Sequence, residues 1–214
     1  AVITAMDADH LDIYGTKENM VEAFEEFARL TQGSLFLKKN LTIRSRAVDG
    51  YYAVGEVADY YADHLRIENG AFHFDYISEN VKMCDLCLRF PGRVNVENAT
   101  AAITLALHAG VTPEEIRTAL PGFKGVARRF DIHADNGRVM YIDDYAHHPQ
   151  EIQAVLSSIR EMWPDKKLTV AFQPHLYTRT RDFYVDFARS LSLADEVVLL
   201  DIYPARELPI PGVT

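Results

Sequence analysis

The sequence predicts an α/β fold built in two parts, and three observations support this prediction. Short strand-like stretches gather between residues 35 and 77, whereas strand and helix patterns alternate regularly after about residue 121. Polar runs follow two of the later strand patterns, at residues 143–149 and 172–181. In an open parallel sheet, such turns lie at the carboxyl ends of the strands, where ligands bind. The two runs therefore suggest one site at one edge of a sheet.

The elements of the first part follow from periodicity and turn signals. Residues 1–5 predict a strand, and apolar residues at helical spacing predict a helix from about Thr16 to Thr31. Asn69-Gly70 is the strongest hairpin signal in the chain. Strand-like stretches separated by Gly, Asn and Asp turns are found at residues 35–37, 41–43, 51–54, 64–67 and 71–77.

Two helices complete the first part. An Ala-rich pattern predicts a helix over residues 97–108, with Gly110 as a left-handed cap. The run from Thr112 to Glu115 then has the pattern of a capping box with proline at the first helical position. A linker is expected at about residues 121–128, which divides the chain into residues 1–124 and 125–214.

The second part has β-α-β-α-β order, which predicts a parallel sheet with right-handed crossovers. The last helix is expected to turn Phe183, Phe187 and Leu191 toward the core. A complete doubly wound domain usually has about five or six strands, and the chain opens in mid-strand without an initiator Met. We therefore expect a fragment of a longer chain. The elements are strands at residues 138–142, 168–172 and 196–202 and helices at residues 149–162 and 181–193.

Composition limits the classes of function. With 214 residues, 48% of them hydrophobic, the chain can bury a substantial core. A net charge of −9 argues against a nucleic-acid surface, because such a surface needs clustered Lys and Arg. The sequence contains no run of 18 or more apolar residues and no signal-peptide pattern at its start, so we expect a cytoplasmic protein that does not enter a membrane.

Cys84 and Cys87 have a spacing that invites a zinc or redox interpretation. A structural zinc site needs four ligands, and the sequence has no second cysteine pair. Buried, reduced thiols are therefore the favoured interpretation.

Several motifs, taken together and in order, resemble the Mur ligase family. The resemblance covers nearly the whole chain and is weakest from about residue 35 to 85. The motifs that carry it are Ala8-Asp9-His10-Leu11-Asp12, residues 91–98, Gly125-Val126-Ala127-Arg128-Arg129-Phe130, residues 143–149, residues 172–181, Tyr203-Pro204-Ala205 and Pro209-Ile210-Pro211-Gly212.

The resemblance implies a domain plan. Residues 1–124 are similar to the second half of a central, P-loop-type ATPase domain, and residues 125–214 to the first part of a C-terminal Rossmann-like domain. The chain departs from the family in one respect, because the 214 residues contain no Gly-Lys-Thr/Ser phosphate loop. We therefore expect these residues alone to have no ligase activity. Missing N-terminal and C-terminal parts of the same enzyme are the expected partners.

The resemblance also implies an activity in peptidoglycan precursor synthesis. The branch of the family that is most similar uses ATP and Mg²⁺ to join L-alanine to the lactyl carboxylate of UDP-N-acetylmuramate through an acyl phosphate. One alternative is a recycling ligase that joins a tripeptide to the same sugar nucleotide. A non-catalytic nucleotide-binding module is a second, favoured by the missing phosphate loop, and a metal-dependent hydrolase is a third.

The resemblance to the Mur ligase family also implies roles for individual residues of this chain. The resemblance makes His10 a magnesium ligand, although on local spacing it could be a turn histidine that caps the next segment. It places Asn95 and Asn98 in the nucleotide pocket, where simple N-capping is the alternative. Arg129 matches an arginine that reaches the ATP phosphates, with Arg128 as a solvated neighbour.

The two polar runs supply the other candidates. By resemblance, Asp144 orients the nucleotide or a magnesium-bound water, and Tyr145 lines the same turn. The substrate-binding candidates are His147, His148, His175 and Arg179, of which Arg179 suits the alanine carboxylate. Asp143 could instead accept backbone hydrogen bonds, and the two adjacent histidines could be exposed turn residues. Many relatives have Arg where this chain has Leu176, and Arg181 is the reserve for that basic contact.

Overall fold

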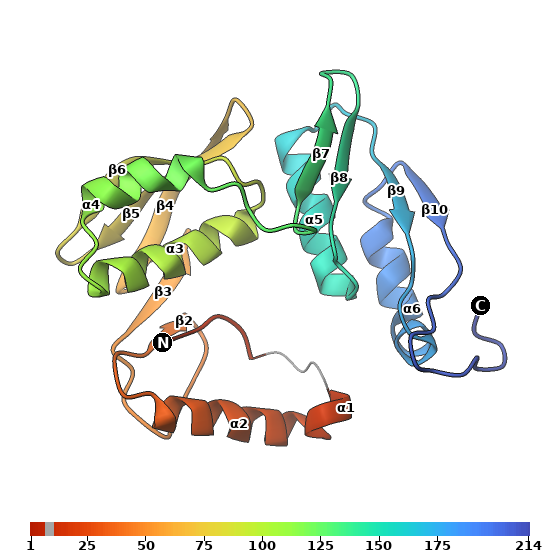
Figure 1. Cartoon of the computed structure of the whole chain (residues 1–214), viewed down its shortest axis with the longest axis horizontal. Helices are drawn as coiled ribbons and strands as arrows, with labels where there is room; N and C mark the ends of the chain where they lie inside the picture. Colours follow the sequence, from red (N-terminus) through yellow and green to blue (C-terminus); the bar gives the residue numbers. More distant parts are fainter. Residues whose placement is uncertain (7–10) are drawn as a thin grey trace. The chain divides into compact units, whose positions relative to one another are not determined.

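The computed structural model describes residues 1–6 and 11–214 and divides the chain into two compact units (Figure 1). The first unit spans Ala1–Phe123 and the second spans Lys124–Thr214. Each unit has its own sheets and its own buried apolar cluster. Among the described residues, none of the helices is both long enough and apolar enough to cross a membrane.

The first unit is built on a six-stranded sheet with the strands in sequence order. The first four strands pair in parallel, and β5 and β6 then pair antiparallel. The predicted hairpin is confirmed: Glu68 pairs with Ala71, and Asn69 and Gly70 both have positive φ, as a tight two-residue turn requires. The strands are β1 (Val2–Ile3), β2 (Phe36–Lys38), β3 (Gly50–Val54), β4 (Tyr60–Glu68), β5 (Ala71–Ser78) and β6 (Lys82–Leu88).

Helices cover this sheet, and two of them begin at or next to the predicted residues. The Thr16 side chain accepts a hydrogen bond from Asn19 N at the start of α2, and Thr112 and Glu115 form the predicted capping box of α4. The helix α3 packs against β3 and β4 with one buried side. The helices are α1 (Leu11–Tyr14), α2 (Lys17–Leu30), α3 (Arg93–His108), α4 (Pro113–Ala119) and the 3₁₀ turn η1 (Leu120–Gly122).

Three expectations for the first unit need correction. Residues 41–43 do not form a strand, although Ile43 is buried against Leu35 and Leu37 and so accounts for the apolar signal. Helix α3 begins four residues earlier than predicted, at Arg93. Strand β6 was not predicted, and it leaves Cys84 exposed and Cys87 only partly buried, so burial of both thiols is wrong.

The second unit contains two strand pairs and two long helices. Strands β7 (Asp131–Asp135) and β8 (Met140–Asp143) pair antiparallel, whereas β9 (Thr169–Phe172) and β10 (Glu196–Leu199) pair in parallel. Helices α5 (Pro149–Met162) and α6 (Tyr177–Leu191) contact each other, as Figure 1 shows. Their shared core contains Ile152, Leu156, Phe172, Phe187 and Leu191.

This arrangement differs from the prediction for the second part in three ways. The described residues form two separate strand pairs, because β8 pairs with the unpredicted β7 rather than with β9. Helix α6 begins at Tyr177 instead of Arg181, directly after Leu176, whose φ of 72° reverses the chain. Phe183, expected to face the core, is 36% exposed and packs against the ring of His148 instead.

Candidate functional site

The two polar turns of the second unit lie side by side. The first follows β8 and the second follows β9, and the ring centroids of His147 and His175 are 6.4 Å apart. Tyr145 contacts His147 at 5.2 Å between centroids, and Tyr203 stacks on His175 at 5.5 Å. Four aromatic rings from three segments therefore form a continuous row.

Asp144 is used to hold two parts of the chain together. Its carboxylate accepts a hydrogen bond from Phe130 N at 2.7 Å and another from Ala146 N at 2.7 Å. Burial raises the pKa of Asp144, and although these hydrogen bonds and Arg129 lower it, the pKa stays above its usual value. Phe130 has a φ of 47°, so the carboxylate fixes a bend that an ordinary residue adopts only at some cost. The residue thus joins residues 128–130 to the turn after β8.

Arg128 and Arg129 both lie beside the ring of Tyr145. The guanidinium carbon is 5.0 Å from the ring centroid for Arg128 and 5.9 Å for Arg129, within the range of a cation–π contact. Tyr145 N also donates to Arg128 O at 2.8 Å. Both arginines are exposed, so their guanidinium groups remain accessible from solvent.

Glu151, which sequence reasoning missed, organises the histidine turn. Its Oε2 atom accepts hydrogen bonds from His147 N at 3.0 Å and His148 N at 3.2 Å. The same oxygen is 3.4 Å from His147 Nδ1, and Oε1 is 3.6 Å from Arg129 Nη1. The signal was present in the sequence, because Glu151 is the third residue of a helix that starts with Pro149, the position of a capping-box glutamate.

The second turn brings His175 and Arg179 together. Arg179 Nη1 is 3.5 Å from His175 Nδ1. Burial, assisted by the charge of Arg179 and by His147, lowers the pKa of His175, which favours the neutral form of this imidazole. Tyr203, which belongs to one of the motifs but was not a predicted site residue, is joined to this turn by its backbone. Its N–H donates to Pro174 O, and its carbonyl oxygen accepts from Leu176 N.

Two further side chains support the second turn. Glu207, also missed, accepts hydrogen bonds from Thr178 N at 3.0 Å and from the Thr178 hydroxyl. Burial acts to raise the pKa of Glu207, but these hydrogen bonds outweigh it and the pKa is lowered overall. Arg181, the reserve candidate, is exposed and pairs with Asp182 at 2.7 Å.

Asn95 and Asn98 lie in the first unit, on the first turns of α3. Asn95 Nδ2 donates to Pro91 O, and Asn98 Nδ2 is 3.5 Å from Asn95 Oδ1, so the two amides are neighbours on one helix face. Gly92, at a φ of 100°, precedes the helix. Asn98 is exposed and Asn95 is partly buried.

The predicted magnesium ligand, His10, lies outside the described residues. Within residues 1–6 and 11–214, no group of three or more His, Cys, Asp or Glu side chains could hold a metal ion. Mg²⁺ commonly keeps several waters and binds through one or two carboxylates together with substrate phosphates.

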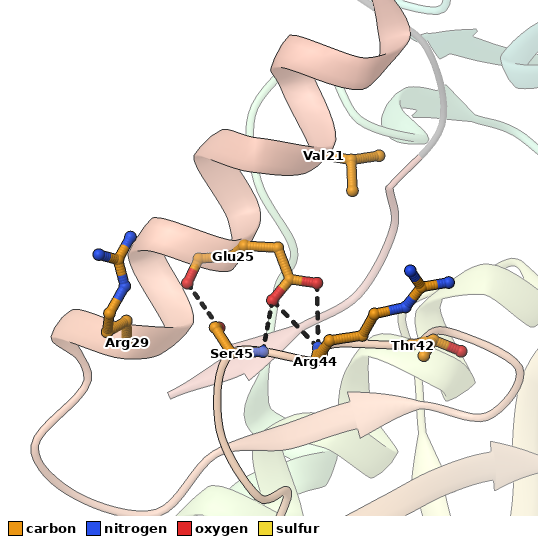
Figure 2. Close-up of a pocket in the computed structure, with 6 residues that line it drawn as sticks. All are labelled: Val21, Glu25, Arg29, Thr42, Arg44 and Ser45. Carbon is orange, nitrogen blue, oxygen red and sulfur yellow. Dashed lines mark hydrogen bonds between the residues drawn. The ribbon is translucent and has the colours of Figure 1, made fainter.

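An open hollow of about 580 Å³ lies elsewhere, between α2 and residues 42–45 (Figure 2). At its wall, the Glu25 carboxylate accepts hydrogen bonds from Arg44 N and Ser45 N, while the Ser45 hydroxyl donates to Glu25 O. Burial acts to raise the pKa of Glu25, but the hydrogen bonds prevail and lower it. None of the predicted site residues lines this hollow. The hydrogen bonds of Glu25 attach α2 to residues 44 and 45.

The turn cluster of the second unit, defined by Arg128, Arg129, Asp144, Tyr145, His147, Glu151, His175, Arg179 and Tyr203, is suited to anion binding. Its carboxylates on Asp144 and Glu151 are occupied by backbone N–H groups. The arginines on the same cluster are exposed or half-buried, and a guanidinium matches phosphate and carboxylate geometry. The cluster therefore offers positive charge, together with a histidine whose pKa is lowered, in a chain whose net charge is −9.

Family models match both units of the chain. Residues 1–106 match the Mur ligase middle domain, and residues 128–210 match the Mur ligase glutamate ligase domain. Together these matches cover the six-stranded sheet, helix α3 and most of the second unit.

Curated relatives align with every residue of the chain. A protein named UDP-N-acetylmuramate–L-alanine ligase from Phocaeicola vulgatus is 50% identical over 219 aligned positions, which is 100% of this chain and 48% of that protein. Proteins with the same name from Christiangramia forsetii and Cytophaga hutchinsonii are 46% and 41% identical, each again over 100% of this chain and 47% of the relative. The chain thus spans about half the length of the curated relatives it matches.

Solved structures have the same fold. The UDP-N-acetylmuramate–alanine ligase of Thermotoga maritima superposes with a TM-score of 0.78 and 30% identity, over 94% of this chain and 46% of that one. A MurF ligase from Thermotoga maritima, solved in complex with ADP, superposes with a TM-score of 0.76 over 94% of this chain and 48% of that one. At 17% identity, the second likeness concerns the fold alone.

Proposed function

Because this chain belongs to the Mur ligase family, we propose that it forms part of a cytoplasmic, ATP-dependent enzyme that joins L-alanine to UDP-N-acetylmuramate. Residues 1–124 would be the second half of the ATP-binding middle domain and residues 125–214 the first part of the C-terminal domain. The observation that carries the proposal is the 50% identity, over the whole of this chain, to a protein with that name.

The proposed reaction needs positive charge at two places. The lactyl carboxylate of the sugar nucleotide attacks the γ-phosphate of ATP to give an acyl phosphate and release ADP, and the amine of L-alanine then displaces phosphate from the acyl carbon and loses a proton to form the amide. A carboxylate and a triphosphate repel each other, so cationic groups must bring them together. The turn cluster supplies such groups from one unit of the chain.

Arg129 is assigned to the ATP phosphates in this proposal. Its guanidinium is exposed on one side, while Tyr145 and Glu151 contact it on the other. A planar guanidinium held in this way loses less conformational entropy on binding than a free one. Asp144 is assigned a positioning role, since both of its oxygens accept backbone hydrogen bonds that hold Phe130 and Ala146.

The second turn is assigned to the incoming amino acid. Arg179 suits the carboxylate of L-alanine, and His175, whose pKa is lowered by burial, can in its neutral form accept a hydrogen bond at one ring nitrogen and donate one at the other. His147 and His148 are assigned to the edge of the substrate site. Leu176 has no charged side chain and is assigned no contact to the substrate. Its backbone, with a φ of 72°, forms the N-cap of α6.

ATP and Mg²⁺ fit the described residues to different extents. Asn95 and Asn98 present adjacent amides on one helix face, which suits hydrogen bonds to a purine or to ordered water. Bound Mg²⁺ would supply neutralisation of phosphate charge. The described residues offer no protein cluster for the ion, so its assigned ligand is His10, and no catalytic step is derived from it.

The test is phosphate release by the complete gene product that contains residues 1–214. With ATP, Mg²⁺ and UDP-N-acetylmuramate, release should require L-alanine, and the 214 residues alone should release none. Release only with a tripeptide acceptor would favour the recycling ligase. Release without any acceptor amine would favour a hydrolase, and nucleotide binding without release would favour a non-catalytic module.

A further inference from the structure

We propose that Glu151 is a positioning residue that fixes the neutral ring of His147 as its Nδ1–H tautomer and so leaves Nε2 available to a ligand. His147 Nδ1 is 3.0 Å from Tyr145 O and 3.4 Å from Glu151 Oε2. A carbonyl oxygen can only accept, so in a neutral ring the hydrogen bond to Tyr145 O requires the proton on Nδ1, and the nearby negative charge of Glu151 favours that position. Within the described residues, Nε2 has no hydrogen-bond partner.

The carboxylate also links His147 to Arg129. One oxygen accepts hydrogen bonds from His147 N and His148 N and lies 3.4 Å from His147 Nδ1, and the other oxygen faces Arg129 Nη1 at 3.6 Å. A single charge therefore sets the direction of the cation assigned to phosphate and of the histidine assigned to the substrate edge. Histidines that bind or transfer protons are commonly oriented by a carboxylate on their other nitrogen in this way.

The local sequence explains why a glutamate can perform this task. Pro149 starts α5, and a side chain on the third residue of a helix reaches back to the N–H groups before the first turn. The positive end of the helix dipole also favours a carboxylate at this point. The capping position of Glu151 thus places its carboxylate beside the ring of His147.

The competing explanation is that Glu151 only caps helix α5. Two variants distinguish this explanation from the positioning role. Glu151→Gln keeps an oxygen that accepts from the backbone N–H groups, so it retains the cap, but it removes the charge that faces His147 and Arg129. Glu151→Ala removes both. Glu161→Ala is the matched control, because Glu161 lies on the same helix and is exposed.

The tautomer is measured by long-range ¹H–¹⁵N correlation of histidine rings in the ¹⁵N-labelled 214-residue chain, at a pH where the rings are neutral. We expect His147 to be Nδ1–H in the wild type and Glu161→Ala, and to shift toward Nε2–H in Glu151→Gln and further in Glu151→Ala. A wild-type ring in the Nε2–H form, or a tautomer unchanged in both Glu151 variants, would overturn the inference.

The consequence for turnover rests on the proposed function and is tested separately. In the complete gene product, Glu151→Gln should lower kcat/KM about tenfold, as loss of a carboxylate behind a working histidine does at metal sites. A tautomer shift without any change in kcat/KM would also overturn the positioning role. An enzyme without L-alanine-dependent turnover would sink the proposed function while leaving the tautomer result intact.

Discussion

The two units use their buried groups differently. In the first unit, the core contains side chains from the strands of the sheet that are each no more than 1% exposed, namely Phe36, Tyr52, Phe72, Phe74 and Tyr76. In the second unit, strand β10 leaves Val197, Val198 and Leu199 between 40% and 65% exposed, and carboxylates hold the loops in place. The difference teaches that buried aromatic packing dominates the first unit, whereas hydrogen bonds from backbone N–H groups to a few carboxylates hold the turns of the second unit.

The largest effect should come from the core of the first unit. Phe74→Ala, at a side chain that is 0% exposed, should lower the free energy of unfolding by about 3–5 kcal/mol. Leu199→Ala, at a residue that is 65% exposed, should change it by less than about 1 kcal/mol. Urea unfolding followed by circular dichroism measures both, and equal losses would erase the contrast between the units.

A smaller effect is expected at the turn of the second unit. Asp144→Ala leaves the N–H groups of Phe130 and Ala146 without their acceptor, which should cost about 1–3 kcal/mol. Phe130 stacks on Trp163 at 6.4 Å, so the fluorescence of Trp163 should also change. Asp143→Ala, which removes only the long contacts to Arg128 at 3.8 Å and His133 at 3.9 Å, should leave the emission nearly unchanged. A wild-type spectrum for Asp144→Ala would refute the role of this carboxylate.

The pH dependence of stability should differ in sign between two carboxylates, Asp144 in the second unit and Asp75 in the first. The pKa of Asp144 is raised, above all by burial, so its contribution to stability is full below the unfolded value of 3.8 and is lost as the pH rises through the folded pKa. Burial also acts to raise the pKa of Asp75, but hydrogen bonds from Asp85 N and His64 lower it overall. Its contribution is present above 3.8 and is lost as the pH falls through the folded pKa.

Neutral variants of these two carboxylates sharpen this contrast. Asp144→Asn should flatten the slope of the unfolding free energy above pH 3.8, and Asp75→Asn should flatten it below pH 3.8. The measurement is a series of urea titrations at graded pH. Identical slopes for the two variants would contradict the assigned directions.

The smallest effect concerns the ring of His175. Burial and then the charge of Arg179 lower the pKa of His175, so Arg179→Gln should raise that pKa while leaving it below its usual value, because burial remains. A histidine titration by NMR reports this directly. Arg189→Gln, on the exposed end of the same helix, is the control and should leave His175 unchanged.

Local signals in the sequence predicted the elements whose ends are chemically marked. Thr16, Asn69-Gly70 and Thr112 each start or reverse a segment where the structure does. Strand β6 escaped prediction because a bulge at Asp85, with φ of 55°, breaks its alternation. Strand β7 escaped because it is almost wholly exposed and so lacks an apolar period.

For the candidate site, the sequence indicated which turns matter but not how they are held. The runs at residues 143–149 and 172–181 lie together because β8 and β9 end at neighbouring places in the second unit. Glu151, Tyr203 and Glu207 act through contacts to backbone atoms in three dimensions, and residue type alone does not reveal such contacts. The two hydrogen bonds that Asp144 accepts likewise become visible only in the fold.

The most direct test of the account is the effect of Arg129 on L-alanine-dependent phosphate release by the complete gene product. Arg129→Ala should lower kcat/KM for ATP by about 100-fold, the scale of losing one charged contact to a reacting phosphate, while Arg181→Ala should leave it nearly unchanged. Retention of wild-type kcat/KM by Arg129→Ala, in a protein that unfolds at the wild-type urea concentration, would contradict the account.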